Sequence, residues 1–215
     1  GMETEVALVH AARGGDRQAF AALVERYQRP VFSLAYRMLG NVEDAEDAGQ
    51  EVFLRAFRAL GGFDFRRPFS TWLLSIAAHH CIDRLRRRRP VESLDALPPW
   101  REPVAEVVDL QHDAESREEA DRIQVGLGRL PDEYRLVLVL RYWYDLGYAD
   151  IAGIVGGTES AIKSRLHRAR RQMAAFLVPG GALDAGRDAT GRPDGATPTA
   201  PTGGQRPWNA IARAS

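Results

Sequence analysis

Apolar residues recur at intervals of three and four positions along most of residues 3–89, which is the spacing of amphipathic helices. In the first such stretch they are Phe20, Leu23, Val24, Tyr27, Val31, Leu34 and Ala35. Pro30 falls inside this stretch and predicts a kink or a break between two helices. Gly40 and Asn41 are expected to end it.

A second helix is predicted from Asp44 to Leu60, because its apolar residues again share one face. The predicted buried residues are Ala45, Ala48, Val52, Phe53, Ala56 and Leu60. A loop is expected at residues 63–69, followed by a third long helix. Ser70 or Thr71 is suited to cap the start of that helix, and Pro90 to end it.

A second helical region follows a Pro-rich and acidic segment. Helices are predicted at Ala114–Leu130, from Pro131 through Trp143, at Tyr148–Val155, and from Thr158 to about Leu177. No segment shows the alternation of a strand, so the predicted fold is all-α, with two small helical domains. The predicted divisions are a first domain at 3–90, a flexible linker at 91–121, a second domain at 122–178 and a Gly/Pro/Ala-rich tail at 179–215, expected to be disordered.

The last two predicted helices form a helix-turn-helix, with a turn at Gly156 and Gly157 and with Thr158 as the cap of the second helix. The buried side of that helix is predicted to hold Ile162, Leu166, Ala169 and Met173. The opposite side offers short polar residues and long cations, as contacts to bases and phosphates require. The alternative is a solvated basic helix in an ordinary helical domain.

The charge is segregated, although the net charge is zero. Residues 84–89 hold five arginines, and residues 163–171 hold five basic residues, with no acid in either segment. Residues 102–121 hold eight acids against Arg117. The zero sum therefore hides two basic patches, which suit a polyanion, and one acidic strip. The alternative is that most of the arginines reflect a GC-rich genome, which favours arginine codons.

Aromatic residues lie beside the first basic patch: Phe63, Phe65, Phe69 and Trp72 accompany Arg66 and Arg67. Aromatic faces next to a cationic track suit single-stranded nucleic acid, whose unstacked bases need a new surface. The alternative for Trp72 is a place in the core. His79 and His80 are expected on the same DNA-facing side.

Several function classes are not expected from the residues. Adjacent residues such as His79 and His80 point about 100° apart on a helix, and no second ligand cluster accompanies them, so we expect no metal. We find no Gly-rich phosphate loop, nucleophile elbow or convincing acid pair, and we expect no cofactor, no catalytic residue and no enzymatic activity. No apolar run approaches a membrane span, residues 3–18 do not resemble a signal peptide, and Cys81 is the only cysteine. We therefore expect no membrane insertion and a cytoplasmic location.

Four motifs occur in order: residues 44–57 (DAEDAGQEVFLRAF), residues 69–73 (FSTWL) followed by Ile76 and Ala77, residues 130–135 (LPDEYR) and residues 164–170 (SRLHRAR). Together they resemble the extracytoplasmic-function sigma factors, the two-domain form of the bacterial sigma-70 family. The resemblance covers about residues 5–177 and implies a promoter-specificity subunit. Its implied partners are core RNA polymerase, through the β′ clamp and β flap, promoter DNA and, in many relatives, an anti-sigma factor.

The resemblance also implies a role for each segment. The polymerase-binding residues would be Asp44, Glu46, Asp47, Gln50, Glu51 and Leu54. The residues binding single-stranded −10 DNA would be Phe63, Arg66, Arg67, Phe69, Ser70, Thr71, Trp72, His79, His80, Asp83, Arg84 and Arg86. The residues binding duplex −35 DNA would be Thr158, Glu159, Ser160, Lys163, Ser164, Arg165, His167, Arg168, Arg170 and Arg171. The acidic linker would follow the RNA path through the polymerase, or act as a plain spacer.

Alternatives stay open at this point. Asp44, Glu46 and Asp47 also suit the positive end of a helix without any partner. The competing function is a stand-alone helix-turn-helix regulator that binds duplex DNA without polymerase, although residues 44–89 exceed what such a protein needs. The tail is either inert, or Trp208 and Ile211 dock on a domain or on polymerase and regulate activity.

Overall fold

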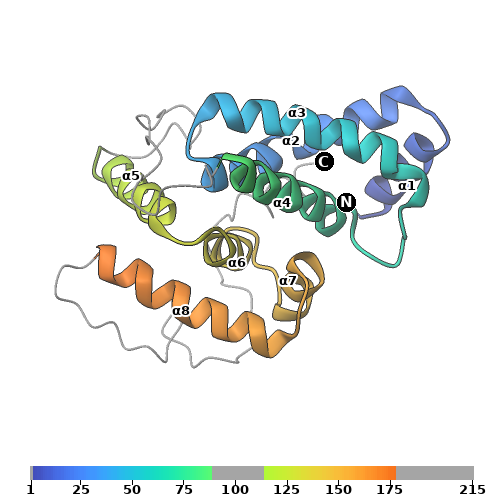
Figure 1. Cartoon of the computed structure of the whole chain (residues 1–215). Coiled ribbons are helices and arrows are strands. Elements are labelled where there is room, and N and C mark those ends of the chain that lie inside the picture. Colours follow the sequence, from blue (N-terminus) through green and yellow to red (C-terminus); the bar gives the residue numbers. More distant parts are fainter. Residues whose placement is uncertain (1, 89–113, 178–215) are drawn as a thin grey trace.

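The computed structural model describes residues 2–88 and 114–177, and these ranges contain helices and no strand (Figure 1). The all-α prediction is therefore confirmed for the described part of the chain. The predictions about Pro90, most of the linker and the tail concern residues outside the described ranges.

The first domain contains α1 (Met2–Arg13), α2 (Arg17–Leu39), α3 (Val42–Ala59), the short 3-10 turn η1 (Leu60–Gly62) and α4 (Phe69–Arg88). Helix α2 continues through Pro30 as one element, so the break allowed by the sequence does not occur. Asp16 caps its start by accepting the backbone N–H groups of Gln18 and Ala19. Gly40 ends it with a left-handed φ of 84°.

Most residues predicted on the buried faces of this domain are buried, but Phe20, Val24 and Phe53 are only partly buried, and the predicted cap of α4 is wrong. Ala45, Ala48, Val52 and Ala56 of α3 are fully buried. Helix α4 begins at Phe69 rather than at a cap formed by Ser70 or Thr71. The carbonyl of Pro68 already accepts the backbone N–H of Trp72 at 3.2 Å, so both hydroxyl residues lie inside the first turn.

The second domain contains α5 (Ala114–Arg129), α6 (Asp132–Tyr142), α7 (Tyr148–Val155) and α8 (Glu159–Leu177). Helix α5 begins inside the segment predicted as flexible linker, so that the linker is helical from Ala114 onward. The turn between α7 and α8 uses Gly156 and Gly157, whose φ angles of 76° and 129° favour glycine. The Thr158 side chain accepts the N–H of Ala161 at 3.2 Å, which confirms the predicted cap.

The two domains pack against each other. Helix α4 contacts α6 and α7, and α2 contacts α5 and α6, so that α6 lies between α4 and α8 (Figure 1). Donors from the second domain reach backbone carbonyls of α2. Gln124 Nε2 donates to Tyr36 O at 3.2 Å, and the Tyr144 hydroxyl donates to Pro30 O at 2.6 Å. Arg37 lies over the ring of Trp143, 4.8 Å from its centroid.

Arg135 is the main polar group of this interface, and it is only 3% exposed. Its guanidinium donates to Leu127 O at 2.8 Å and Gly128 O at 3.0 Å, both at the end of α5, and also to Met38 O of the first domain. A buried cation is tolerated when its donors are satisfied. Arg135 therefore ties the end of α2 to the end of α5.

Candidate nucleic-acid and protein interfaces

Helix α8 presents the cationic surface that its sequence predicts. Ile162, Leu166, Ala169 and Met173 are buried, which confirms the predicted inner face. The outer face is formed by the exposed residues Thr158, Glu159, Ser160, Lys163, Ser164, Arg168 and Arg171, with Arg165, His167 and Arg170 partly buried at its edges. Polar residues and cations thus share one side of a helix that follows a short helix and a tight turn.

Neighbouring side chains support several of these cations. Lys163 lies 5.3 Å from the ring centroid of Tyr148, and Arg165 forms an ion pair with Glu133 at 3.7 Å. Arg168 and Arg170 approach the hydroxyls of Tyr134 and Tyr142 at 3.5 and 3.4 Å. These aromatic residues of α6 and α7 therefore flank the cations of α8, while Lys163 and Arg168 themselves stay exposed to solvent.

Helix α3 presents an acidic surface with an apolar end. Glu46, Asp47 and Gln50 are exposed, and Glu51 pairs with Arg55 at 2.8 Å. Leu54 is 51% exposed. Exposed apolar side chains beside charges are typical of protein interfaces.

Phe57 extends this surface and was not predicted. It is 48% exposed and packs edge-on against Phe20, with ring centroids 4.9 Å apart. Phe57 follows Leu54 by three residues and therefore lies on the same face of the helix. This spacing is the feature of the sequence that identifies it.

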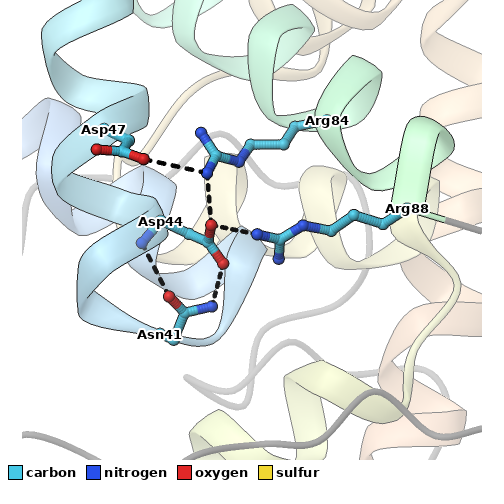
Figure 2. A network of polar contacts seen from close by, with 5 residues as sticks. All are labelled: Asn41, Asp44, Asp47, Arg84 and Arg88. Carbon is cyan, nitrogen blue, oxygen red and sulfur yellow. Dashed lines mark hydrogen bonds and ion pairs between the residues drawn. The ribbon is translucent and has the colours of Figure 1, made fainter.

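Asp44 lies in the first turn of α3, one turn before Asp47, inside a network with Asn41, Asp47, Arg84 and Arg88 (Figure 2). Its backbone N–H donates to Asn41 Oδ1 at 2.8 Å, and Asn41 Nδ2 donates to Asp44 Oδ2. Arg84 Nη2 donates to Asp44 Oδ1 at 2.5 Å, and Arg88 pairs with the same oxygen. The Asp44 side chain is 14% exposed, so this carboxylate is largely enclosed.

The network changes the acidity of Asp44. Burial alone raises the pKa of this carboxyl, but hydrogen bonds from Arg88, Asn41 and Arg84 outweigh burial and lower the pKa from 3.8 to about 2. The charged form is thus the one that the fold stabilises.

We expect Asp44→Asn to lower the free energy of unfolding at pH 7 by about 1–2 kcal/mol, because hydrogen bonds to a charged group are lost. The depressed pKa means that the stabilisation is complete above the unfolded pKa of about 3.8 and disappears as the pH falls through about 2. Urea unfolding of both proteins between pH 7 and pH 2 measures the difference. A difference that stays constant down to pH 2 contradicts this assignment.

The loop between η1 and α4 is built on an aromatic cluster. Phe63 and Phe69 are 5% and 4% exposed, and their ring centroids lie 5.7 Å apart. Trp72 packs on both rings and is partly buried. The structure therefore corrects the expectation that Phe63 and Phe69 form an open stacking surface: they hold the loop from within, whereas Arg66 and Arg67 are exposed on it.

The structure also corrects the expected position of His80. The sequence predicts this side chain on the DNA-facing side of its helix, but it is 8% exposed, and neither ring nitrogen has a hydrogen-bonding partner among the described residues. Burial lowers its pKa, and the charge of Arg55 lowers it further, so that the neutral ring is favoured. His79 is exposed, as expected.

The predicted −10 residues in the second half of α4, apart from His80, lie in two different surroundings. Arg84 joins the network with Asp44, while His79, Asp83 and Arg86 line a pocket at the domain interface. The other residues of that pocket are Ala78, Ile82, Glu133, Leu136, Ile154, Val155 and Arg165. One predicted −35 residue, Arg165, thus lies in the same pocket as predicted −10 residues.

Sequence reasoning missed Asn41, Arg88 and Arg135 as organising residues. Asn41 directly precedes α3 and is a preferred helix cap, so its local role was recognisable. Arg88 lies one turn after Arg84, which was a signal for a shared partner. The burial of Arg135 could not be foreseen, because nothing in the sequence of α6 distinguishes a buried arginine from an exposed one.

Two further expectations concern ligands and membranes. Within residues 2–88 and 114–177 no group of three or more His, Cys, Asp and Glu side chains is arranged to hold a metal. No helix in the same ranges is both long and apolar enough to cross a membrane.

The fold and its surfaces define a two-domain helical protein with a helix-turn-helix in the second domain. Comparison with known proteins agrees. The Sigma-70 region 2 family matches residues 23–91, and the family described as Sigma-70, region 4 matches residues 120–173.

Curated relatives match over most of their length. The chain is 38% identical over 172 residues to the ECF RNA polymerase sigma factor SigW of Bacillus subtilis, covering 77% of this chain and 92% of the relative. It is 34% identical over 189 residues to the RNA polymerase sigma-H factor of Pseudomonas aeruginosa, covering 82% and 95% of the two chains. For SigM of Mycobacterium tuberculosis the identity is 35%, and the coverage is 81% and 84%.

A solved structure, CnrH in complex with the cytosolic domain of CnrY, is similar with a TM-score of 0.60 and 28% identity, covering 81% of this chain and 97% of that one. The sigma factor RpoE, solved with the anti-sigma factor NepR from Bartonella quintana, shares the fold with a TM-score of 0.55 at 21% identity, covering 74% and 96%. The chain belongs to the ECF sigma factors of the sigma-70 family. This membership favours the sigma-factor reading over a stand-alone regulator.

Proposed function

We propose that this sigma factor docks on core RNA polymerase through α3, reads duplex −35 DNA through α8 and captures the −10 strand through α4 and the loop before it. The observation that carries the proposal is the separation of charge between two accessible surfaces. Acids and an apolar end lie on α3, and cations lie on α8. One surface suits an electropositive protein and the other a polyanion.

The docking surface is proposed to consist of Glu46, Asp47, Gln50, Glu51 and Leu54. Four of these five side chains are exposed, and Glu51 is partly so. The acids steer an electropositive partner toward this surface, and the exposed leucine adds apolar area that is buried when the partner binds. The β′ clamp is the partner proposed for this surface, and the β flap for the second domain.

The −35 surface is proposed to be the outer face of α8. Ser160, Ser164 and Lys163 lie near its N-terminal end, where a recognition helix contacts base edges. Arg168 and Arg171 lie further along and suit phosphates.

The −10 surface is proposed to combine Arg66 and Arg67 of the loop with His79, Arg84 and Arg86 of α4. Trp72 is the aromatic residue at the border of this surface, since Phe63 and Phe69 are buried beneath it. A single tryptophan supports about 1–3 kcal/mol of stacking, which helps to hold an extruded base but does not open a duplex without polymerase.

The two domains are proposed to separate when the promoter is engaged. The −35 and −10 elements lie roughly 25 base pairs apart, on the order of 80 Å along the duplex at about 3.4 Å per base pair. In the closed arrangement Arg86 and Arg165 line one pocket, so both surfaces cannot reach elements at that separation. An anti-sigma factor of the kind bound to RpoE is proposed as a regulator that acts on the same domain arrangement.

Transcription from a cognate promoter tests this function. Core polymerase with the full-length chain should give a promoter-specific transcript in run-off assays, and core polymerase alone should give none. Promoters are found by sequencing transcripts made from genomic DNA. Failure to produce any specific transcript, with a known ECF sigma factor active in the same assay, counts against the function.

The packing of the two domains against each other can be tested by the reactivity of Cys81. This thiol is fully buried, and burial raises its pKa to about 12. It lies close to Tyr144 of the second domain. We expect Gln124→Ala with Tyr144→Phe to raise the rate of thiol labelling on the order of 10-fold, because the cross-domain hydrogen bonds of Gln124 to Tyr36 O and Arg37 O and of Tyr144 to Pro30 O are lost.

The matched control is Ser75→Ala, which removes a hydrogen bond to Trp72 O within α4. Labelling of this control should stay near the wild-type rate. A double variant that labels no faster than Ser75→Ala shows that opening of the domains does not expose Cys81.

A further inference from the structure

The network of Figure 2 joins the start of α3 to the end of α4. Asp44 lies in the first turn of α3, where the helix dipole favours an anion. Arg84 and Arg88 lie in the last two turns of α4, where the dipole favours cations. The two helix ends thus place opposite charges against each other, although Asp44 and Arg84 are 40 residues apart in the sequence.

Both oxygens of Asp44 are engaged inside the protein. Oδ1 accepts from Arg84 and pairs with Arg88, and Oδ2 accepts from Asn41. The side chain is 14% exposed, whereas that of Asp47 is 62% exposed. A docking partner can reach Asp47 without disturbing the fold, but it reaches Asp44 only by displacing two arginines.

The arginines, in contrast, keep donors available. A guanidinium carries five N–H donors in a planar fork, and Asp44 engages one terminal nitrogen of each. The Arg88 side chain is 42% exposed and that of Arg84 is 28% exposed. Their remaining donors suit phosphate oxygens.

We propose that Asp44 is a positioning residue for the −10 strand and not a polymerase contact: it holds Arg84 and Arg88 side by side so that both meet the strand's phosphates. Without the carboxylate, two like charges one turn apart repel each other, and both long side chains regain rotamer freedom. The inference rests on the proposed function. It also adds Arg88 to the −10 surface.

Asp47 links the same arginine to the docking surface. Its Oδ2 lies 3.4 Å from Arg84 Nη2, a longer contact than the 2.5 Å from Arg84 to Asp44. If a cation of polymerase pairs with Asp47, Arg84 loses its contact with Asp47 and keeps its ion pair with Asp44. The cluster of two arginines and Asp44 then carries a net positive charge toward the DNA.

The test compares full-length Asp44→Asn with Asp47→Asn. One measurement is the Kd for core polymerase, and the other is binding of the assembled holoenzyme, at saturating polymerase, to a promoter whose −10 region is already open as a mismatched bubble. Asp44→Asn should change the Kd for polymerase less than 3-fold and weaken bubble binding about 10-fold, with a smaller salt dependence. Asp47→Asn should show the opposite pattern.

Arg88→Ala distinguishes positioning from a general loss of stability. It should reproduce the weaker bubble binding, and adding Asp44→Asn to it should weaken binding much less than the product of the two single effects. Thermal unfolding of each variant shows that the measurements are made on folded protein. A merely structural role of Asp44 leaves the salt dependence of bubble binding unchanged.

Three outcomes overturn the inference: unchanged bubble binding by Asp44→Asn, a loss of polymerase affinity equal to that of Asp47→Asn, or full additivity with Arg88→Ala. A wild-type chain that does not bind polymerase or the bubble promoter counts instead against the proposed function. The two failures are therefore distinguishable.

Discussion

Asp47→Arg should weaken binding to core RNA polymerase on the order of 100-fold, because it places a cation where an electropositive partner is expected. Asp47 is 62% exposed and lies between the exposed Glu46 and Gln50 on α3. The substitution leaves the buried face of α3 intact, so the fold should persist. Fluorescence anisotropy of a labelled chain titrated with core polymerase measures the effect.

The matched control is Glu25→Arg, the same charge reversal at an exposed position of α2. It should bind polymerase within about 3-fold of wild type, since a charge away from the interface acts only at long range and is screened by salt. Equal losses for the two variants would show that net charge, and not the α3 surface, determines the affinity.

Lys163→Ala with Arg168→Ala should weaken binding of the holoenzyme to promoter duplex about 100-fold, while affinity for polymerase stays unchanged. Both side chains are exposed on the outer face of α8, and each lost base or phosphate contact costs about 1–3 kcal/mol. The slope of log K against log salt should fall by about one for each phosphate contact removed. Filter binding or anisotropy over a range of salt concentrations measures both quantities.

Arg129→Ala provides the control within the same domain, because Arg129 is exposed on α5 and lies over the ring of Phe176. It should leave promoter affinity and the salt slope near their wild-type values. If the double variant loses polymerase and promoter binding to the same extent, α8 does not serve as a separate DNA-reading surface.

Local features of the chain were predictable because their causes lie within a few residues. The buried face of α8 follows from the spacing of Ile162, Leu166 and Ala169, and Thr158 caps the helix as its chemistry predicts. The turn before it needed backbone conformations that glycine adopts at low cost, and Gly156 and Gly157 are present there.

The aromatic loop shows where composition is ambiguous. A phenylalanine beside arginines suits a stacked base and suits a small core equally well, because both uses bury an apolar ring. Phe63 and Phe69 are buried by contact with each other and with Trp72, and these contacts depend on how the loop folds over α4.

The contacts between distant residues could not be predicted. The sequence assigns Arg84 and Asp44 to different partners, yet they form a direct ion pair. Arg135 reaches Met38, 97 residues away in the sequence, across the domain interface. Periodicity identifies which side of a helix is buried, but it does not identify what packs there.

The most direct test of the sigma-factor account is size-exclusion chromatography of the purified full-length chain, and of a version ending at residue 178, with bacterial core RNA polymerase. The full-length chain should form a stoichiometric complex with polymerase, and a tighter complex of the shorter version would mark the tail as inhibitory. Failure of both forms to co-elute with polymerase, while the chain still binds duplex DNA, would contradict the account and favour a stand-alone DNA-binding regulator.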